Sequence, residues 1–592
     1  MAVTEAEVRS GAYYDSVVLM HLQRSLAALP GVLDAGVVMG TAANKDILAQ
    51  SDLLTPEVQA AVADDLVIVV RAKDDAAARA ALGQVDELLT RRRGGVEQDY
   101  HPKSLESAVQ LMPDAQWVLV SVPGRYAAGV ARQALRLGKN VFLYSDNVSL
   151  DDETALKQTA AEKGLLVMGP DCGTAIVNGV GLGFANRVRR GPIGLVAASG
   201  TGLQQVSARL HQLGSGITHA LGTGGRDLSE AVGAVTARQG LDLLSRDPET
   251  RVIVLISKPP SPSVADELLR VARAAGKPVL VDFIGYSPSA RQVDNLHFAI
   301  TLDETADLAV QLTARGTKDE ELALSNAKGR KTKDLDEAAN LTRFAPGQRY
   351  LRGLFSGGTL AYEALLILQD YLPAVYSNVP LNKDYRLANS MVSQAHTIVD
   401  LGEDEFTVGR LHPMMDNDLR IRRLQQEADD PEVAVILLDV VLGYGAHADP
   451  AGELAPAITR ARVGAEEAGR HLEVVAIVVG TDEDPQDLNA QVQQLKAAGV
   501  QVETSNEAAV RYVGRLVQAL DQPVGSTHLP SASHLKSVDL AVLHQPLAAI
   551  NVGLESFTES LIAQDAPVIQ VDWRPPAGGN EKLMAILERM RG

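Results

Sequence analysis

The sequence predicts a multidomain α/β protein, and three observations support that fold class. The chain has 592 residues, more than one hydrophobic core usually supports. Apolar residues make up 46% and charged residues 22%, the balance of an ordinary globular protein. From about residue 104 onward, apolar strands alternate with amphipathic helices, as in parallel sheets connected by crossover helices.

The first domain is predicted over residues 1–100. Its pattern gives strands at about 7–14, 32–40 and 65–72 and helices at about 15–31 and 74–92. The order strand, helix, strand, strand, helix is that of a ferredoxin-like sandwich. Asp74 and Asp75 stand at the start of the second helix, where acidic residues favour the positive end. We expect a small regulatory or interface domain.

The spacing of apolar residues divides the remaining chain into further domains and a linker. A Rossmann-like domain is expected over 104–188, and a second α/β unit follows over 190–315. Residues 316–345 are charged and poorly periodic, which predicts a linker. A third α/β unit over 346–524 repeats the strand, small-residue turn and helix that open the second unit. Residues 525–592 are predicted to form a C-terminal docking segment.

Composition excludes several classes of function. The net charge of −19 without a large basic block argues against nucleic-acid and anionic-lipid partners. A single cysteine rules out an intramolecular disulfide and fits a reducing compartment. The first sixteen residues are acidic and lack an apolar core, and no run of eighteen apolar residues occurs. We therefore expect a cytoplasmic protein that neither binds nucleic acid nor enters a membrane.

Two small-residue turns predict an anion site. Ser199-Gly200-Thr201-Gly202 and Ser356-Gly357-Gly358-Thr359 each follow an apolar strand and lead directly into a helix. Small residues let the backbone approach a ligand, and a helix start offers free N–H donors with about half a positive charge. One such turn is more often only tight packing at a corner, whereas two in matching places favour binding. We predict that backbone N–H groups and the four hydroxyls hold a phosphate.

Further motifs resemble the succinyl-CoA synthetase superfamily over most of residues 104–480. The alpha-subunit motifs are matched in order by Pro113-Asp114-Ala115, Gly169-Pro170-Asp171-Cys172, Ser199-Gly200-Thr201 and Gly222-Thr223-Gly224-Gly225. The beta-subunit motifs are matched by Ser356-Gly357-Gly358-Thr359, Asp400-Leu401-Gly402 and the run from Asp439 to Gly445. In that superfamily the two helix starts point at one phosphoryl group from opposite sides. The resemblance implies two flavodoxin-like, succinyl-CoA synthetase-type domains that share a phosphate site.

The whole chain resembles the FdrA family, which fuses the alpha-like and beta-like parts. The resemblance is carried by Ser16-Val17, residues 39–45, residues 407–414, residues 550–554 and residues 576–580. It implies a subunit of a hetero-oligomeric oxamate carbamoyltransferase in ureide breakdown. There, inorganic phosphate attacks the N-carbamoyl group of a small-molecule ureide such as oxalurate and yields carbamoyl phosphate and an amide. Phosphate or carbamoyl phosphate is then a substrate, no cofactor is expected, and a homodimer or hetero-complex is implied.

Departures from the ligase pattern keep two alternatives open. No phosphohistidine loop follows Lys277-Pro278-Val279, no glycine-rich CoA turn opens the Rossmann-like domain, and no ATP-grasp domain is present. These departures argue against CoA binding and against acyl-CoA synthesis by this chain alone. The alternatives are an ADP-forming acyl-CoA synthetase that uses a partner's nucleotide domain, and a noncatalytic scaffold subunit.

Catalytic candidates come from loops near predicted strand ends. Arg226 or Arg410 could bind a substrate carboxylate or ureido group, because a guanidinium makes a two-point contact; each could equally be a surface or capping residue. His412 could give acid–base help, and the same holds for Asp416, His447 and Asp449. Their spacing matches no metal signature, so we expect no metal site, and a solvated loop is the alternative. Cys172 is expected to be structural.

Overall fold

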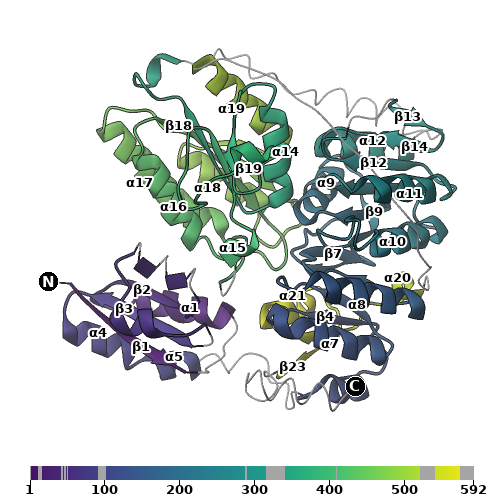
Figure 1. The fold of residues 1–592 in the computed structure, drawn as a ribbon, viewed down its shortest axis with the longest axis horizontal. Coiled ribbons are helices and arrows are strands. Elements are labelled where there is room, and N and C mark those ends of the chain that lie inside the picture. The colour runs from purple at the N-terminus through teal and green to yellow at the C-terminus, as the bar shows by residue number, and fades with distance from the viewer. Residues whose placement is uncertain are drawn as a thin grey trace.

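The computed structural model describes residues 2–10, 16–41, 44–45, 48–49, 51–63, 65–90, 102–286, 290–314, 341–407, 410–520 and 541–573. These residues form four sheets with helices packed on them, and Figure 1 shows the resulting units. The predicted α/β multidomain fold is confirmed. Most of the predicted linker, residues 408–409 and the motif at 576–580 lie outside the described residues. No helix within the described ranges is both long and apolar enough to cross a bilayer.

The N-terminal domain is a three-stranded antiparallel sheet in the order β1-β3-β2. Its elements are β1 (Val3–Arg9), α1 (Ser16–Ala27), β2 (Val32–Met39), α3 (Pro56–Ala60), β3 (Leu66–Ala72), α4 (Asp75–Leu82) and α5 (Val85–Thr90). Helices α1 and α4 cover one face, where Ile68 and Val70 are buried, and α3 covers the other, where Val67 and Val69 are buried. The first strand lies earlier than predicted, and Gly83 ends α4, so the predicted second helix is two helices.

The Rossmann-like domain contains α6 (Leu105–Leu111), β4 (Trp117–Val120), α7 (Gly124–Arg136), β5 (Asn140–Leu143), α8 (Leu150–Lys163) and β6 (Val167–Met168). Its sheet is completed by C-terminal elements: α20 (Ala541–His544), β22 (Ala549–Val552), α21 (Glu555–Ile562) and β23 (Val568–Val571). All five strands are parallel, in the order β23-β22-β4-β5-β6. Residues 541–573, predicted to lie in a separate docking segment, are therefore part of this domain, because β22 pairs with the otherwise open edge of β4. Figure 1 shows the C-terminal elements α21 and β23, in yellow, beside β4.

The second α/β unit has an eight-stranded sheet in the order β13-β14-β12-β11-β9-β10-β7-β8. Its strands are β7 (Thr174–Val177), β8 (Val180–Gly183), β9 (Arg190–Ala198), β10 (Ile217–Gly222), β11 (Val252–Ser257), β12 (Val279–Phe283), β13 (Gln292–Val293) and β14 (Leu296–Phe298). Its helices are α9 (Gly200–Gln212), α10 (Val235–Arg246), α11 (Pro262–Arg273) and α12 (Leu302–Ala314). The hairpin β7–β8 joins this sheet, so the unit begins before the predicted boundary at residue 190.

The third α/β unit has a six-stranded parallel sheet in the order β16-β17-β15-β18-β19-β20. Its strands are β15 (Tyr350–Phe355), β16 (Tyr376–Ser377), β17 (Thr397–Asp400), β18 (Val433–Val441), β19 (Glu473–Val479) and β20 (Gln501–Glu503). Its helices are α14 (Gly358–Leu368), α15 (Asp404–Thr407), α16 (Asp418–Asp429), α17 (Pro450–Glu467), α18 (Leu488–Ala497) and α19 (Asn506–Leu520).

The second and third units place their opening strand in the same way. Strand β9 lies between β10 and β11, and β15 lies between β17 and β18, with parallel pairing throughout. In each unit the helix that follows the central strand, α9 or α14, starts at the carboxyl edge of the sheet. The internal repeat predicted from the sequence is thus present in the fold.

Candidate functional site

The two predicted turns meet each other in the structure. The Ser199 hydroxyl donates to Thr359 Oγ1 over 2.8 Å, although the two residues lie 160 positions apart. A Cβ placed on Gly357 would come within 2.5 Å of the Thr201 side chain, so the backbones are as close as small residues permit. Helices α9 and α14 therefore present their positive ends to one place.

That place is a cavity of about 600 Å³ bordered by all four parts of the fold. Both turns line it, together with the start of α7 and the start of α15. The N-terminal domain contributes Leu19, Met39, Thr41 and Ala63. Because these segments are far apart in the chain, the cavity exists only when the units are assembled.

Free backbone donors remain at both helix starts. The Ser199 side chain caps α9 by accepting the Gly202 N–H over 3.1 Å, and it takes no other N–H of the first turn. Helix α14 begins at Gly358, and its N-cap residue Gly357 provides no side-chain cap. The first N–H groups of an α-helix have no partner inside the helix, so these donors are available to an anion in the cavity.

The hydroxyls of the turns are not equivalent. Ser356 donates to the buried carboxylate of Asp439, which also accepts the Ser356 N–H over 2.8 Å. Ser356 thus fixes the turn and does not offer its hydroxyl proton to a ligand, contrary to the prediction from its position. Thr359 Oγ1 accepts from Ser199 and keeps its own proton to donate.

Lys258 is a site residue that the sequence analysis missed. It follows β11 and lines the cavity, and a Cβ on Gly358 would lie 3.3 Å from its Nζ. Burial raises the pKa values of Asp171 and Asp400, and the charge of Lys258 opposes that rise; within the described ranges Lys258 has no carboxylate within ion-pair distance. Its place after a parallel strand beside the one that leads to α9 is the signal that could have identified it.

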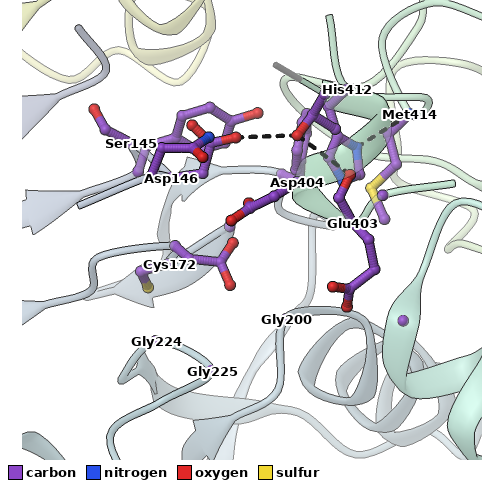
Figure 2. A pocket seen from close by; sticks show the side chains of 18 of the residues that line it. Ser145, Asp146, Cys172, Gly200, Gly224, Gly225, Glu403, Asp404, His412 and Met414 are labelled. Atoms are coloured by element: carbon purple, nitrogen blue, oxygen red, sulfur yellow. Dashed lines mark hydrogen bonds between the residues drawn. The ribbon is translucent and has the colours of Figure 1, made fainter. Parts of the chain in front are cut away.

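His412 lies in the cavity wall and is held in one tautomer. Its Nδ1 accepts the Met414 N–H over 3.2 Å (Figure 2), so the proton of a neutral ring is on Nε2. Burial, together with the nearby charge of Arg420, lowers the pKa of His412 to about 3. The ring packs on Phe184 at 5.1 Å between centroids. His412 is therefore a neutral hydrogen-bond donor and not a base.

The two predicted arginines have different surroundings. The guanidinium of Arg226 donates to Glu153 over 2.9 Å and to the Val148 carbonyl over 2.7 Å, and it does not line the cavity. Arg410 does line the cavity, and its Nη1 is buried without a partner among the described residues. Burial lowers the pKa of Arg410, although Asp418 lies 3.5 Å away.

The other loop candidates are engaged elsewhere. His447 pairs with Glu453 at 3.3 Å, and Asp449 caps α17 by accepting the Gly452 N–H over 3.0 Å. Cys172 is buried although it lines the cavity, and burial raises the pKa of its thiol to about 12, which disfavours the nucleophilic thiolate. Within the part of the chain that the structure describes, no group of His, Cys, Asp and Glu side chains could hold a metal ion.

The cavity lining is rich in carboxylates: Asp146, Asp171, Asp400, Glu403 and Asp404. Figure 2 shows Glu403 and Asp404 projecting toward the region that Gly200 borders. Burial, together with the charges of Asp146, Asp404 and Glu403, raises the pKa of Asp171 to about 8. Burial, followed by Asp146 and Glu403, likewise raises the pKa of Asp404. The raised pKa values of Asp171 and Asp404 show that the carboxylates of this lining lie close enough together for their charges to interact.

Comparisons with known proteins agree with this architecture. Residues 354–516 match the family model described as CoA-ligase, and residues 1–103 match the one described as AllF, heavy metal-associated domain. Escherichia coli (strain K12) has an uncharacterized protein YahF that is 44% identical over 499 residues, covering 84% of this chain and 96% of YahF.

More distant relatives are ligases. The alpha subunit of the ADP-forming succinate–CoA ligase of Aquifex aeolicus (strain VF5) is 27% identical over 210 residues, covering 34% of this chain and 67% of that subunit. The solved apo dinucleotide-forming acetyl-coenzyme A synthetase 1 of Ca. Korarchaeum cryptofilum is 16% identical and covers 69% of this chain and 85% of its own, with a TM-score of 0.28.

The fold and the family model together define a protein of the CoA-ligase class. The chain belongs to the FdrA-like, succinyl-CoA synthetase-like family that includes YahF. The expected carbamoyltransferase activity is wrong, because the matching model and the characterised relatives are acid–thiol ligases. The only cysteine is Cys172, so the likeness of residues 1–103 to a heavy metal-associated domain brings no thiolate ligand.

Proposed function

We propose that this chain catalyses the acyl-transfer half of an acyl-CoA synthetase reaction. An acyl phosphate binds in the cavity, the thiol of CoA attacks its acyl carbon, the C–O bond to phosphate breaks, and acyl-CoA and inorganic phosphate leave. The thiol proton goes to solvent or to the departing phosphate. The reverse reaction makes acyl phosphate from acyl-CoA and phosphate.

The meeting of two helix N-termini at one cavity carries this proposal. Each start supplies unpaired N–H groups and about half a positive charge, and two of them nearly balance one phosphoryl charge. Lys258 adds a full positive charge beside Gly358. Such preorganised donors stabilise a phosphate leaving group without the reorganisation that water would need.

The remaining roles follow from the contacts. The N–H groups of Gly200, Thr201 and Gly358 and the Thr359 hydroxyl bind phosphoryl oxygens. His412 donates from Nε2 to the acyl oxygen, where negative charge develops during attack by the thiol. Because its ring stays neutral, His412 does not accept a phosphoryl group in this scheme.

The thiol substrate approaches along the start of α7. Residues 121–125 line the same cavity, and α7 begins at Gly124 without a side-chain cap. A Cβ on Gly124 would lie 2.1 Å from the Asp146 carbonyl, so glycine is required there. The free N–H groups of this third helix start suit the phosphates of CoA. A partner chain supplies the nucleotide-dependent step that forms the acyl phosphate, so the working enzyme is a hetero-complex.

Gly200→Val tests the anion site directly. A Cβ at Gly200 meets only Thr174 Oγ1, at 3.6 Å, so valine fits the fold and fills the space in front of α9. We expect phosphate affinity, measured by calorimetry, and thioester formation from acetyl phosphate and CoA, followed by absorbance, each to fall about a hundredfold.

Gly129→Val is the matched control, because Gly129 is an exposed helical glycine of α7 with nothing within 4 Å of its Cβ. It is expected to retain wild-type binding and rate. Wild-type protein that neither binds phosphate nor forms thioester with a copurified partner present would refute the proposal.

A further inference from the structure

The cavity lining combines positive and negative groups. The two helix starts and Lys258 are positive, whereas the lining also carries five carboxylates, of which Asp400 lies beside Gly358 and the other four are Asp146, Asp171, Glu403 and Asp404. A simple acyl phosphate, such as that of a fatty acid, is bound by the positive groups only. It leaves Asp171 and Asp404 facing an apolar chain, where an unpaired carboxylate is costly.

Carboxylates without a cation do not by themselves show that a ligand binds. Two further side chains in the cavity lining indicate a ligand and its chemistry. Gln204, in the second turn of α9, is 1% exposed, and neither its amide nitrogen nor its amide oxygen has a partner within the described residues. Thr174 is 2% exposed, and its hydroxyl is likewise unpartnered there. Both residues line the cavity.

Buried polar atoms are nearly always hydrogen-bonded, so we expect a ligand to supply the missing partners of Gln204 and Thr174. The amide nitrogen of Gln204 needs an acceptor and its amide oxygen needs a donor, so the ligand must carry donors as well as acceptors. Phosphoryl oxygens supply acceptors only. Thr174 lies beside Gly200 at the start of α9, where the phosphoryl group is placed, whereas CoA is placed along α7, so the acyl part of the substrate is the nearest source of these donors.

We infer that the acid substrate carries an N–H donor group, an amine or a primary amide, close to its carboxyl end. The phosphoryl group lies on the helix starts, and the N–H group lies against Asp171 and Asp404, with Gln204 and Thr174 completing its hydrogen bonds. This inference rests on the proposed function and specifies its substrate class.

A matched pair of phosphate monoesters tests the inference. Ethyl phosphate carries the anion alone, and O-phosphoethanolamine adds an ammonium group. The two are compared at pH 9, where both phosphates are dianionic, since phosphate monoesters have a second pKa of about 6, and where Asp171, with a pKa of about 8, is ionised. We expect the full-length protein to bind O-phosphoethanolamine roughly tenfold or more tightly in calorimetry, because a hydrogen bond between charged groups gains about that much.

Asp171→Asn is the informative variant. Asp171 has a φ of 54°, a conformation that asparagine also adopts, so the backbone is retained. We expect the preference for O-phosphoethanolamine to drop to about threefold or less, with ethyl phosphate binding unchanged or tighter, because one repelling charge is gone. Asp294→Asn is the control: Asp294 has the same φ of 54° but lies in an exposed turn between β13 and β14.

The possible failures are distinguishable. Equal affinity for the two esters overturns the inference and leaves the anion site standing. A preference that requires added Mg²⁺ also overturns it, because the carboxylates would then be binding a metal ion. Absence of binding by either ester overturns both the inference and the proposed function.

Discussion

A single buried carboxyl group can make the stability of the fold depend on pH. Asp282, at the end of β12, is fully buried; its Oδ2 accepts from Thr305 over 2.7 Å, and its Oδ1 has no partner among the described residues. Burial raises the pKa of Asp282 to about 7. A carboxyl with a raised folded-state pKa stabilises the fold fully below its unfolded pKa of 3.8, and that contribution is lost as the pH rises through about 7.

Asp282→Asn removes this ionisation while keeping the shape of the side chain. We expect the variant to gain stability over the wild type as the pH rises, by about 2 kcal/mol more at pH 8.5 than at pH 5.5. Thermal unfolding at the two pH values measures the difference. The exposed Asp266→Asn in α11 serves as control, and an Asp282→Asn gain that does not change with pH would contradict the assignment.

Individual residues also show which features of the site could be predicted from the sequence and which could not. The turns at 199–202 and 356–359 were found because a small-residue turn between a strand and a helix is a local pattern. Lys258 was missed because its neighbour Gly358 is distant in sequence, and Ser356 was misassigned because its partner Asp439 is on another strand. The tautomer of His412 depends on a turn geometry that no motif encodes.

At the scale of elements, a buried ion cluster joins α8 to the loop after β10. Lys157 is 0% exposed and lies 3.0 Å from Glu153 and 2.8 Å from Asp227, and it donates to the Thr223 carbonyl over 2.9 Å. Asp227 in turn caps α10 by accepting the Ala237 N–H over 2.8 Å. Removing one partner from such a cluster leaves a buried charge uncompensated.

Lys157→Met is therefore expected to lower the free energy of unfolding by about 3–5 kcal/mol, since the buried Asp227 then loses the cation that it pairs with. Denaturant unfolding measures the loss. Arg246→Met, which breaks a half-exposed pair with Asp242 in α10, is the control and should change stability by less than about 1 kcal/mol. Equal effects of the two substitutions would show that the cluster is not the anchor proposed here.

Most elements were predictable because their signals are local. Asp74 caps α4 as its position predicts, and strands β2 and β3 fall where apolar runs occur. The role of residues 549–571 was not predictable in the same way, since a short apolar strand does not reveal which distant edge it will join. The order of strands in a sheet is set by tertiary packing and not by local propensity.

At the scale of the whole molecule, ion pairs join the N-terminal domain to the third α/β unit. Arg24 in α1 lies 2.7 Å from Glu453 in α17, and Arg422 in α16 lies 3.3 Å from Asp34 in β2. Arg422 also donates to Ser51 over 2.9 Å. These contacts hold Met39 and Thr41 against the cavity.

Combined Arg24→Met and Arg422→Met substitutions should loosen this attachment. We expect amide hydrogen exchange of residues 37–41 to rise about severalfold, while β18 and β19 stay protected. Because the pairs are partly exposed, added salt should produce a smaller effect of the same kind in the wild type. Arg9→Met, which breaks a pair inside the N-terminal domain, is the control, and an unchanged exchange rate in the double variant would argue for an apolar attachment.

Strand β22 has a consequence for how the molecule is made. It pairs with β4, and the contact between Ser121 and Val552 joins residues 431 positions apart. A ribosome therefore completes both sheets of the ligase-type units before the partner of β4 exists, and that edge stays open on the nascent chain throughout. Truncated or stalled products are consequently expected to be captured by chaperones, with Trp117 and its neighbours as the exposed segment.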